Sequence, residues 1–294
     1  MEQTANPYFI NAEEIGDYAE ITVTTHDGVE EDLRLHYLES GIGEPLLLVH
    51  GIGQSLYTWR NVFGELSESY RVIAVDLPGH GYSSRPEHFA YSMDEMANAL
   101  HAFLGAMGIT CTHAMGFSTG AGYLFRMLSL YPDDLANFVA LCPGGIGSDM
   151  PRFYQMLKKP LSGVFARNLF TEGDVKDMLT DAVEDESCIR EEDIRQYYLP
   201  LKDGLTREAM MYAIRNYDLK GTLEDVKESD HEVLCVWGKE DLYHPVKTSV
   251  RFQSCLQFGR YYMMRNAGHL LQEEVPEQLI KLLLSYIPAR ADAR

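Results

Sequence analysis

The sequence predicts an α/β fold: a mostly parallel eight-stranded sheet flanked by helices, with a helical cap inserted after the sixth strand. Several apolar runs are continuous rather than alternating, as expected for strands that helices cover on both faces. Helix-period stretches separate these runs, which favours parallel strands joined by crossover connections. One long segment between two of the runs contains no convincing strand, and it is too long for an ordinary loop.

The first two predicted strands form an antiparallel hairpin. Residues 21–24 and 33–37 are strand-like alternating stretches, and they flank the turn sequence Asp27-Gly28. The six strands that follow are predicted from apolar runs at 46–50, 72–76, 113–117, 138–142, 233–237 and 261–264. Together these segments account for the eight strands of the sheet.

Helical patterns lie between the apolar runs. Residues 93–104 carry an apolar stripe at helical spacing, and a second helix at 121–130 ends before Pro132. A last helix is predicted from about 276 to 286. These helices fit the crossovers of a parallel sheet.

The segment from 145 to 228 is predicted to be a helical cap over the active-site end of the sheet. Helix-like stretches appear at 152–169, 172–182, 191–198 and 206–217. The core domain is therefore predicted at 1–144 and 229–294. Most apolar side chains of the cap are expected to pack within it and a minority to line a substrate chamber. The candidates are Phe153, Tyr154, Met156, Phe165, Phe170, Met178, Tyr197, Tyr198, Met210, Met211 and Tyr212.

The composition excludes several classes of function. The 294 residues include 25 Lys and Arg against 44 Asp and Glu, a formal net charge of −19, so neither nucleic acid nor a membrane surface is an expected partner. The amino-terminal residues lack the basic and apolar regions of a signal peptide, and no apolar run approaches a membrane span. The five cysteines lack metal-ligand spacing and suit reduced thiols, which favours a cytoplasmic location. Assembly of the protein into a homodimer stays an open alternative.

Ser118 is the predicted nucleophile. It stands in Gly116-Phe117-Ser118-Thr119-Gly120, between the strand at 113–117 and the helix at 121–130. Gly116 and Gly120 are residues that a sharp strand-to-helix turn requires, because a side chain at either position would collide with neighbouring backbone. The short motif carries little weight alone, but its place between a buried strand and a helix strengthens it.

Asp241 and His269 are the predicted acid and base. A serine hydroxyl needs a base, and that base needs an orienting carboxylate. Asp241 follows the strand at 233–237, and His269 follows the strand at 261–264. The chain order serine, acid, histidine is the order expected for this fold, and the spacing places acid and base on adjacent loops. The motif spacing from Gly238 favours Asp241 over its neighbour Glu240.

The loop after the strand at 46–50 is the predicted oxyanion site. In His50-Gly51-Ile52-Gly53, the glycines allow backbone N–H groups to turn inward, so the amides of Ile52 and Thr119 are expected to bind an oxyanion. His50 and Gly51 are expected to support this loop.

These motifs resemble those of the α/β-hydrolase superfamily over nearly the whole chain. His50-Gly51, residues 76–83, the Ser118 turn, residues 238–241 and Gly268-His269 all match. The resemblance is to the capped bacterial branch that contains carboxylesterases, cofactor-free haloperoxidase-like enzymes and meta-cleavage-product C–C hydrolases. It implies Ser118 as nucleophile, Asp241 as acid and His269 as base, with no cofactor.

Phe117, Tyr57, Trp59 and His244 are weaker candidates for the substrate pocket. No spacing of His, Cys or acidic residues predicts a metal site. Glu273 and Glu274 are interpreted as a charged helix start.

The expected activity is hydrolysis of a small, largely apolar ester-like molecule through an acyl-enzyme. C–C bond hydrolysis of a dienoic keto acid, acyl transfer to another acceptor and a slow ligand-sensing role stay open. The dienoic acid would need a cation for its carboxylate, and the residues to inspect are Arg60, Arg126 and Arg152.

Overall fold

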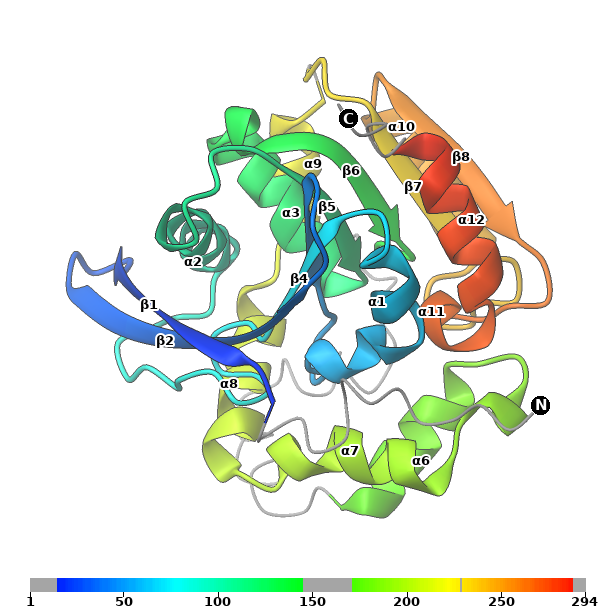
Figure 1. The fold of residues 1–294 in the computed structure, drawn as a ribbon, viewed down its shortest axis with the longest axis horizontal. Coiled ribbons are helices and arrows are strands. Elements are labelled where there is room, and N and C mark those ends of the chain that lie inside the picture. Colours follow the sequence, from blue (N-terminus) through cyan, green and yellow to red (C-terminus); the bar gives the residue numbers. More distant parts are fainter. Residues whose placement is uncertain (1–14, 145–170, 228, 288–294) are drawn as a thin grey trace.

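The protein is built on one eight-stranded sheet (Figure 1). The computed structural model describes residues 15–144, 171–227 and 229–287. The strands lie in the order β1-β2-β4-β3-β5-β6-β7-β8. Their bounds are β1 Asp17–Thr24, β2 Glu30–Ser40, β3 Pro45–Val49, β4 Arg71–Val75, β5 Thr112–Phe117, β6 Leu135–Leu141, β7 Val233–Gly238 and β8 Gly259–Met264.

The sheet is parallel from β4 to β8, which confirms the predicted architecture. β1 and β2 form the expected antiparallel hairpin, and β2 also pairs antiparallel with β4. All the remaining pairs are parallel. Because parallel strands end at the same edge, the loops after β3, β5, β7 and β8 lie at one edge of the sheet.

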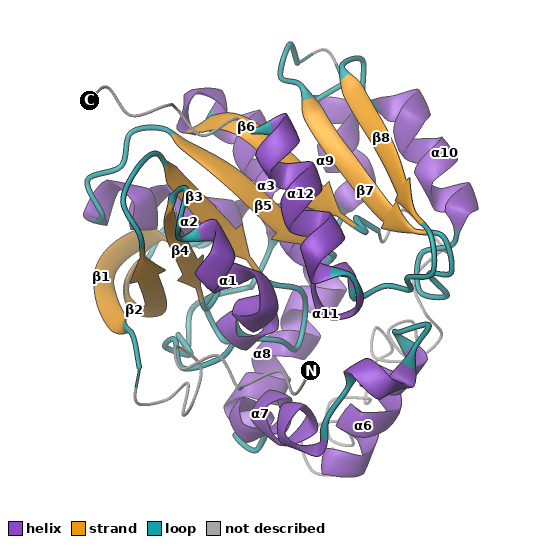
Figure 2. Cartoon of the chain, turned by 45° about the vertical axis from the view of Figure 1, so that its right-hand side comes forward, coloured by secondary structure: helices purple, strands orange, loops and turns teal. Residues whose placement is uncertain are grey.

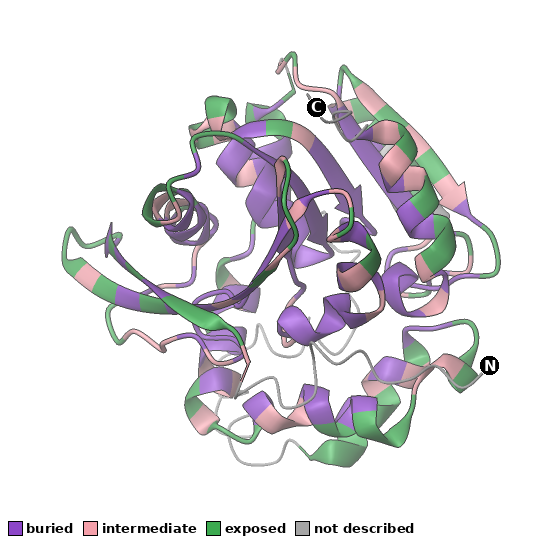
Figure 3. Cartoon of the chain, viewed as in Figure 1, coloured by how far each residue is buried: buried purple, intermediate pink, exposed green. Residues whose placement is uncertain are grey.

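Helices cover both faces of the sheet (Figure 2). The helices α1, α11 and α12 cover one face, and α2, α3, α9 and α10 cover the other. This coverage explains the continuous apolar runs, since every residue of β5 and of β7 is buried (Figure 3). The bounds are α1 Arg60–Leu66, α2 Met93–Ala106, α3 Thr119–Leu130, α9 Leu219–Asp225, α10 Val246–Cys255, α11 Leu271–Glu274 and α12 Pro276–Tyr286.

The segment predicted as the cap contributes helices between β6 and β7. Three of them, α6 (Glu172–Asp181), α7 (Glu191–Leu201) and α8 (Gly204–Asn216), gather at the edge toward which β7 and β8 point (Figure 2). The fourth, α9, packs against the core helix α3 instead. The helix predicted at 152–169 lies outside the described residues.

Two further observations concern helix length and cysteine pairing. In the part of the chain that the structure describes, no helix is long and apolar enough to cross a membrane. All five cysteines are free thiols in the structure. The cytoplasmic location stays a prediction.

Candidate active site

Ser118 lies on a strained turn between β5 and α3. Its backbone has φ 52° and ψ −116°, a left-handed conformation that side chains rarely adopt. The serine is the N-cap residue of α3, so the positive end of that helix dipole lies beside it. Strain of this kind persists only when the surroundings enforce it, and it is common at reacting groups.

The two glycines of the turn have no room for a side chain. A Cβ at Gly116 would lie 2.6 Å from Cα of Ala121, and one at Gly120 would lie 2.3 Å from the carbonyl oxygen of His50. These are the backbone collisions expected from the sequence. The packing therefore brings the Ser118 turn directly against the loop after β3.

His269 and Asp241 are hydrogen-bonded. Nδ1 of His269 lies 2.8 Å from Oδ2 of Asp241, and both residues are buried. The other carboxylate oxygen of Asp241 accepts from the backbone amides of Tyr243 and His244, each at 2.8 Å. Burial by itself would raise the pKa of Asp241, but His269 and the His244 amide outweigh it and lower that pKa. An ionised Asp241 fixes the tautomer in which Nδ1 of His269 carries the proton.

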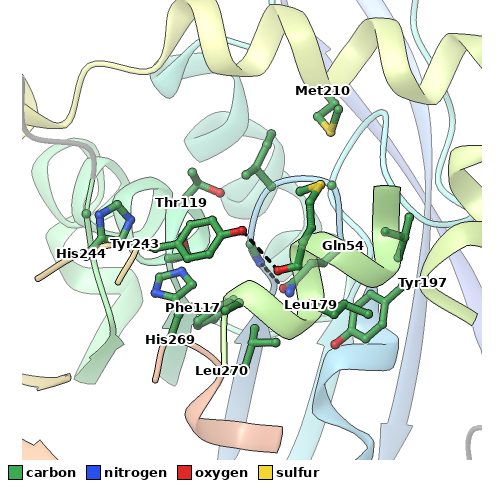
Figure 4. Close-up of a pocket in the computed structure, with 18 of the residues that line it drawn as sticks. Gln54, Phe117, Thr119, Leu179, Tyr197, Met210, Tyr243, His244, His269 and Leu270 are labelled. Carbon is green, nitrogen blue, oxygen red and sulfur yellow. Dashed lines mark hydrogen bonds between the residues drawn. The ribbon is translucent and has the colours of Figure 1, made fainter. Parts of the chain in front are cut away.

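Aromatic rings surround the His269 imidazole (Figure 4). Tyr243 stacks on it with ring centroids 5.3 Å apart, and Phe117 lies 4.9 Å away. His244 meets it edge-on at 5.0 Å. Burial lowers the pKa of His244 to about 3, which keeps this second histidine neutral.

Cys142, at the end of β6, lies beside the Asp241–His269 pair. Among the residues that the structure describes, this trio alone brings Cys, Asp and His atoms together at metal-ligand spacing, within 4.8 Å. The hydrogen bond between Asp241 and His269 accounts for the closeness of these two residues. Nδ1 of His269 carries the proton of that bond, so this nitrogen has no lone pair with which to bind a metal ion. The absence of a metal centre stays a prediction.

His50 supports the loop after β3 through both ring nitrogens. Nε2 accepts from the Leu77 amide at 3.0 Å, so Nδ1 carries the proton and donates to the Gly51 carbonyl at 2.8 Å. Burial lowers the pKa of His50, consistent with a neutral ring. The backbone amide of Gly51 donates to the Gln54 side chain at 3.3 Å. The next backbone amide along the loop is that of Ile52.

A cavity joins these elements, and both Ile52 and Thr119 line it. Its wall is largely aliphatic and aromatic. Met178, Tyr197 and Met210 line it from the predicted cap, whereas the cap candidates before residue 171 lie outside the described residues. The full lining is Gly51, Ile52, Gly53, Gln54, Phe117, Ser118, Thr119, Gly144, Val175, Met178, Leu179, Ala182, Tyr197, Leu201, Met210, Tyr217, Tyr243, His244, His269 and Leu270.

The structure corrects the placement of two pocket candidates, Tyr57 and Trp59. Both belong to a buried 3-10 helix, Leu56–Trp59, and neither lines the cavity. The Tyr57 hydroxyl donates to Asp193 of α7 at 2.8 Å, and Trp59 is fully buried. Both residues immediately precede α1, because the chain turns into that helix directly after the loop.

The sequence analysis missed a buried ionic network behind the cavity. Glu273 is buried rather than part of an exposed helix start, and its carboxylate accepts from Arg60 and, at 2.6 Å, from the Tyr197 hydroxyl. Arg60 is therefore engaged away from the cavity. Arg126 is also engaged elsewhere, with Asp94 and Asp225, and Arg152 lies outside the described residues.

Known proteins resemble the chain along most of its length. A curated relative, the 2-hydroxy-6-oxo-6-(2'-aminophenyl)hexa-2,4-dienoic acid hydrolase of Metapseudomonas resinovorans, is 28% identical over 96% of this chain and 97% of its own. The uncharacterized hydrolase YugF of Bacillus subtilis is 28% identical over 86% of this chain and 92% of its own.

A similar fold occurs in a solved structure, the meta-cleavage product hydrolase CumD of Pseudomonas fluorescens IP01. The TM-score is 0.77 at 24% identity, covering 93% of this chain and 98% of that one. The family described as the alpha/beta hydrolase fold matches residues 44–276. This chain is therefore a member of the α/β-hydrolase family, and the protein is a hydrolase of that fold.

Proposed function

We propose that the protein is a serine hydrolase that cleaves small, neutral, largely apolar esters. The observation that carries the proposal is that one cavity is lined by both Ser118, on its strained turn, and His269, which is hydrogen-bonded to Asp241. A nucleophile, a base and an orienting carboxylate on three separate loops are the parts that acyl transfer requires.

The reaction proceeds in two steps. Ser118 Oγ attacks the ester carbonyl carbon while its proton passes to Nε2 of His269, and His269 returns that proton to the departing alkoxide. Water then attacks the acyl-serine by the same proton route and releases the acid. The amides of Ile52 and Thr119 bind the oxyanion, each contributing about 3 kcal/mol of transition-state stabilisation.

The cavity wall supports a neutral substrate. Among the described residues that line it there is neither Arg nor Lys. The tyrosine hydroxyls are bonded to protein: Tyr217 donates to Gly144 and Tyr243 to Met178, each at 3.2 Å. These rings therefore act as largely apolar walls of the cavity.

A second candidate is C–C bond hydrolysis. The name of the Metapseudomonas relative supports it, since that enzyme acts on a dienoic acid. Such a substrate needs a cation for its carboxylate, and neither Arg60 nor Arg126 lines the cavity. Arg152, the third of these arginines, lies outside the described residues, so its replacement tests whether it supplies that cation.

The test is a screen of p-nitrophenyl esters of increasing acyl length beside a 2-hydroxy-6-oxo dienoic acid. We expect turnover of the short esters, and labelling by a fluorophosphonate that is lost in Ser118→Ala. Cleavage of the dienoic acid alone, lost in Arg152→Gln, would favour the second candidate. A folded protein that neither turns over any substrate nor forms an adduct at Ser118 would contradict both, and would favour ligand sensing.

A further inference from the structure

Three consecutive backbone N–H groups fasten the loop that carries His269. The Ala267 amide donates to the Glu240 carboxylate at 3.1 Å, and the Gly268 amide donates to Oε2 of Glu274 at 2.7 Å. The His269 amide donates to the carbonyl of Ala182 at 2.6 Å. The backbone of the predicted base is therefore held from three directions.

Glu274 connects this loop to the segment predicted as the cap. Its second oxygen, Oε1, accepts from the amide of Glu184 at 2.6 Å and from that of Asp185 at 3.4 Å. Both residues follow α6. One carboxylate thus binds backbone on both sides of the boundary between the cap segment and the histidine loop.

The two loops are also in direct van der Waals contact. A Cβ at Gly268 would lie 2.7 Å from the carbonyl oxygen of Ala182 and 3.0 Å from the Glu184 nitrogen. Ala182 lines the cavity, as do Val175, Met178 and Leu179 of α6. The segment that includes α6 therefore both lines the cavity and contacts the loop that carries His269.

We propose that Glu274 is a positioning residue whose carboxylate ties residues 182–185 to the histidine loop and so holds the His269 ring against Asp241. This inference rests on the proposed function, in which His269 is the base. It adds that one side chain contributes both to the docking of the segment after α6 and to the alignment of the base.

A carboxylate suits this task because both its oxygens accept hydrogen bonds. Glutamine has the same length but only one accepting oxygen, so Glu274→Gln would turn an NH₂ group toward backbone N–H donors of one loop. Glu274→Asp keeps the charge but is one methylene shorter, so it cannot bind both loops at these distances. Glu277, exposed in the first turn of α12, offers a matched control, Glu277→Gln.

The experiment combines ester kinetics with amide hydrogen exchange of peptides that contain residues 182–185 and 267–269. In Glu274→Gln we expect kcat to fall by about 10- to 100-fold with KM within about threefold of wild type, because misalignment of a base affects the chemical step. The amides of Gly268 and Glu184 should exchange at least about tenfold faster. Glu277→Gln should match wild type in both measurements.

Two results would overturn the positioning role: exchange and kcat both unchanged in Glu274→Gln, or faster exchange with an unchanged kcat. If Glu274→Gln does not fold, Glu274→Asp takes its place with the same expected direction. Failure of the proposed function itself looks different, since wild type and Glu277→Gln would then also lack ester turnover and a Ser118 adduct.

Discussion

Arg60 and Glu273, which are 213 positions apart in the chain, form a buried ion pair in which Nη1 lies 2.6 Å from Oε1. The side chain of Arg60 is 4% exposed and that of Glu273 is 0% exposed. Asp193 of α7 extends the network, with an oxygen 3.0 Å from Nε of Arg60. These residues join α1 and α11 of the core to α7 of the predicted cap through charges that water does not screen.

Removing one partner of this network should destabilise the fold. Glu273→Ala removes a carboxylate that pairs with the buried Arg60 guanidinium, and we expect the free energy of unfolding to fall by about 3 kcal/mol. Urea denaturation measures this change. The double replacement Arg60→Met with Glu273→Leu should lose less, because no buried charge is left uncompensated. A Glu273→Ala protein as stable as wild type would show that the pair contributes nothing.

Asp241→Asn should reduce kcat by about ten-thousandfold with the fold intact, because an amide at this position stabilises the wrong tautomer of His269. Steady-state hydrolysis of the best ester measures this loss. The neighbouring Glu240→Gln provides the control, since Glu240 accepts from the Ala267 amide rather than from the histidine ring. We expect Glu240→Gln to stay within about tenfold of wild type. Equal losses in the two variants would contradict the assignment of Asp241 as the acid.

Gly144 and His244 should be energetically coupled. A Cβ at Gly144 would lie 2.2 Å from atoms of the His244 ring, so Gly144→Ala must displace that ring beside His269. Overpacking of this kind costs about 1–3 kcal/mol, and we expect kcat/KM to fall by about tenfold or more. In a His244→Ala background the same substitution should have little effect. Equal losses in both backgrounds would show that the ring does not transmit the change.

The stability of the amino-terminal part of the sheet should depend on pH through His36. Nδ1 of His36 lies 2.8 Å from Oδ2 of Asp76, and both side chains are fully buried. Burial lowers the pKa of His36, but the Asp76 carboxylate more than offsets this effect, so that pKa is raised. A raised histidine pKa contributes stability that is complete below the unfolded-state value of about 6.5 and is lost as pH rises through the folded value.

The measurement is urea denaturation of wild type and His36→Gln between pH 6 and pH 9. We expect the difference in unfolding free energy between the two proteins to be largest at pH 6 and to shrink toward pH 9. A difference that grows with pH would have the opposite sign and would contradict a charged His36 in the folded protein.

Much of the fold and of the candidate site could be predicted from local sequence. The apolar runs predicted β3 to β8 to within a few residues, and the glycines around Ser118 predicted a turn that the structure places at φ 52°. Asp241 and His269 were placed on adjacent loops, and β7 and β8 are indeed paired. These predictions succeeded because strand periodicity and turn geometry are encoded within short stretches of chain.

Other features depended on segments that meet only in the folded chain. Tyr57 was expected in the pocket, but its hydroxyl bonds to Asp193, 136 positions away. Glu273 and Glu274 were interpreted as a charged helix start, since acidic residues favour the first turn of a helix. Their partners come from α1, α7 and the loop after α6. A pattern of neighbouring residues does not predict hydrogen bonds or ion pairs between segments so far apart in the chain.

The sequence by itself therefore determined the sheet, the order of its strands along the chain and the loops that carry Ser118, Asp241 and His269. The tertiary structure decided which side chains the cap segment brings against those loops. The physical reason is that hydrophobic periodicity is local, whereas the cost of burying a charge is met by a partner whose position only the complete fold defines.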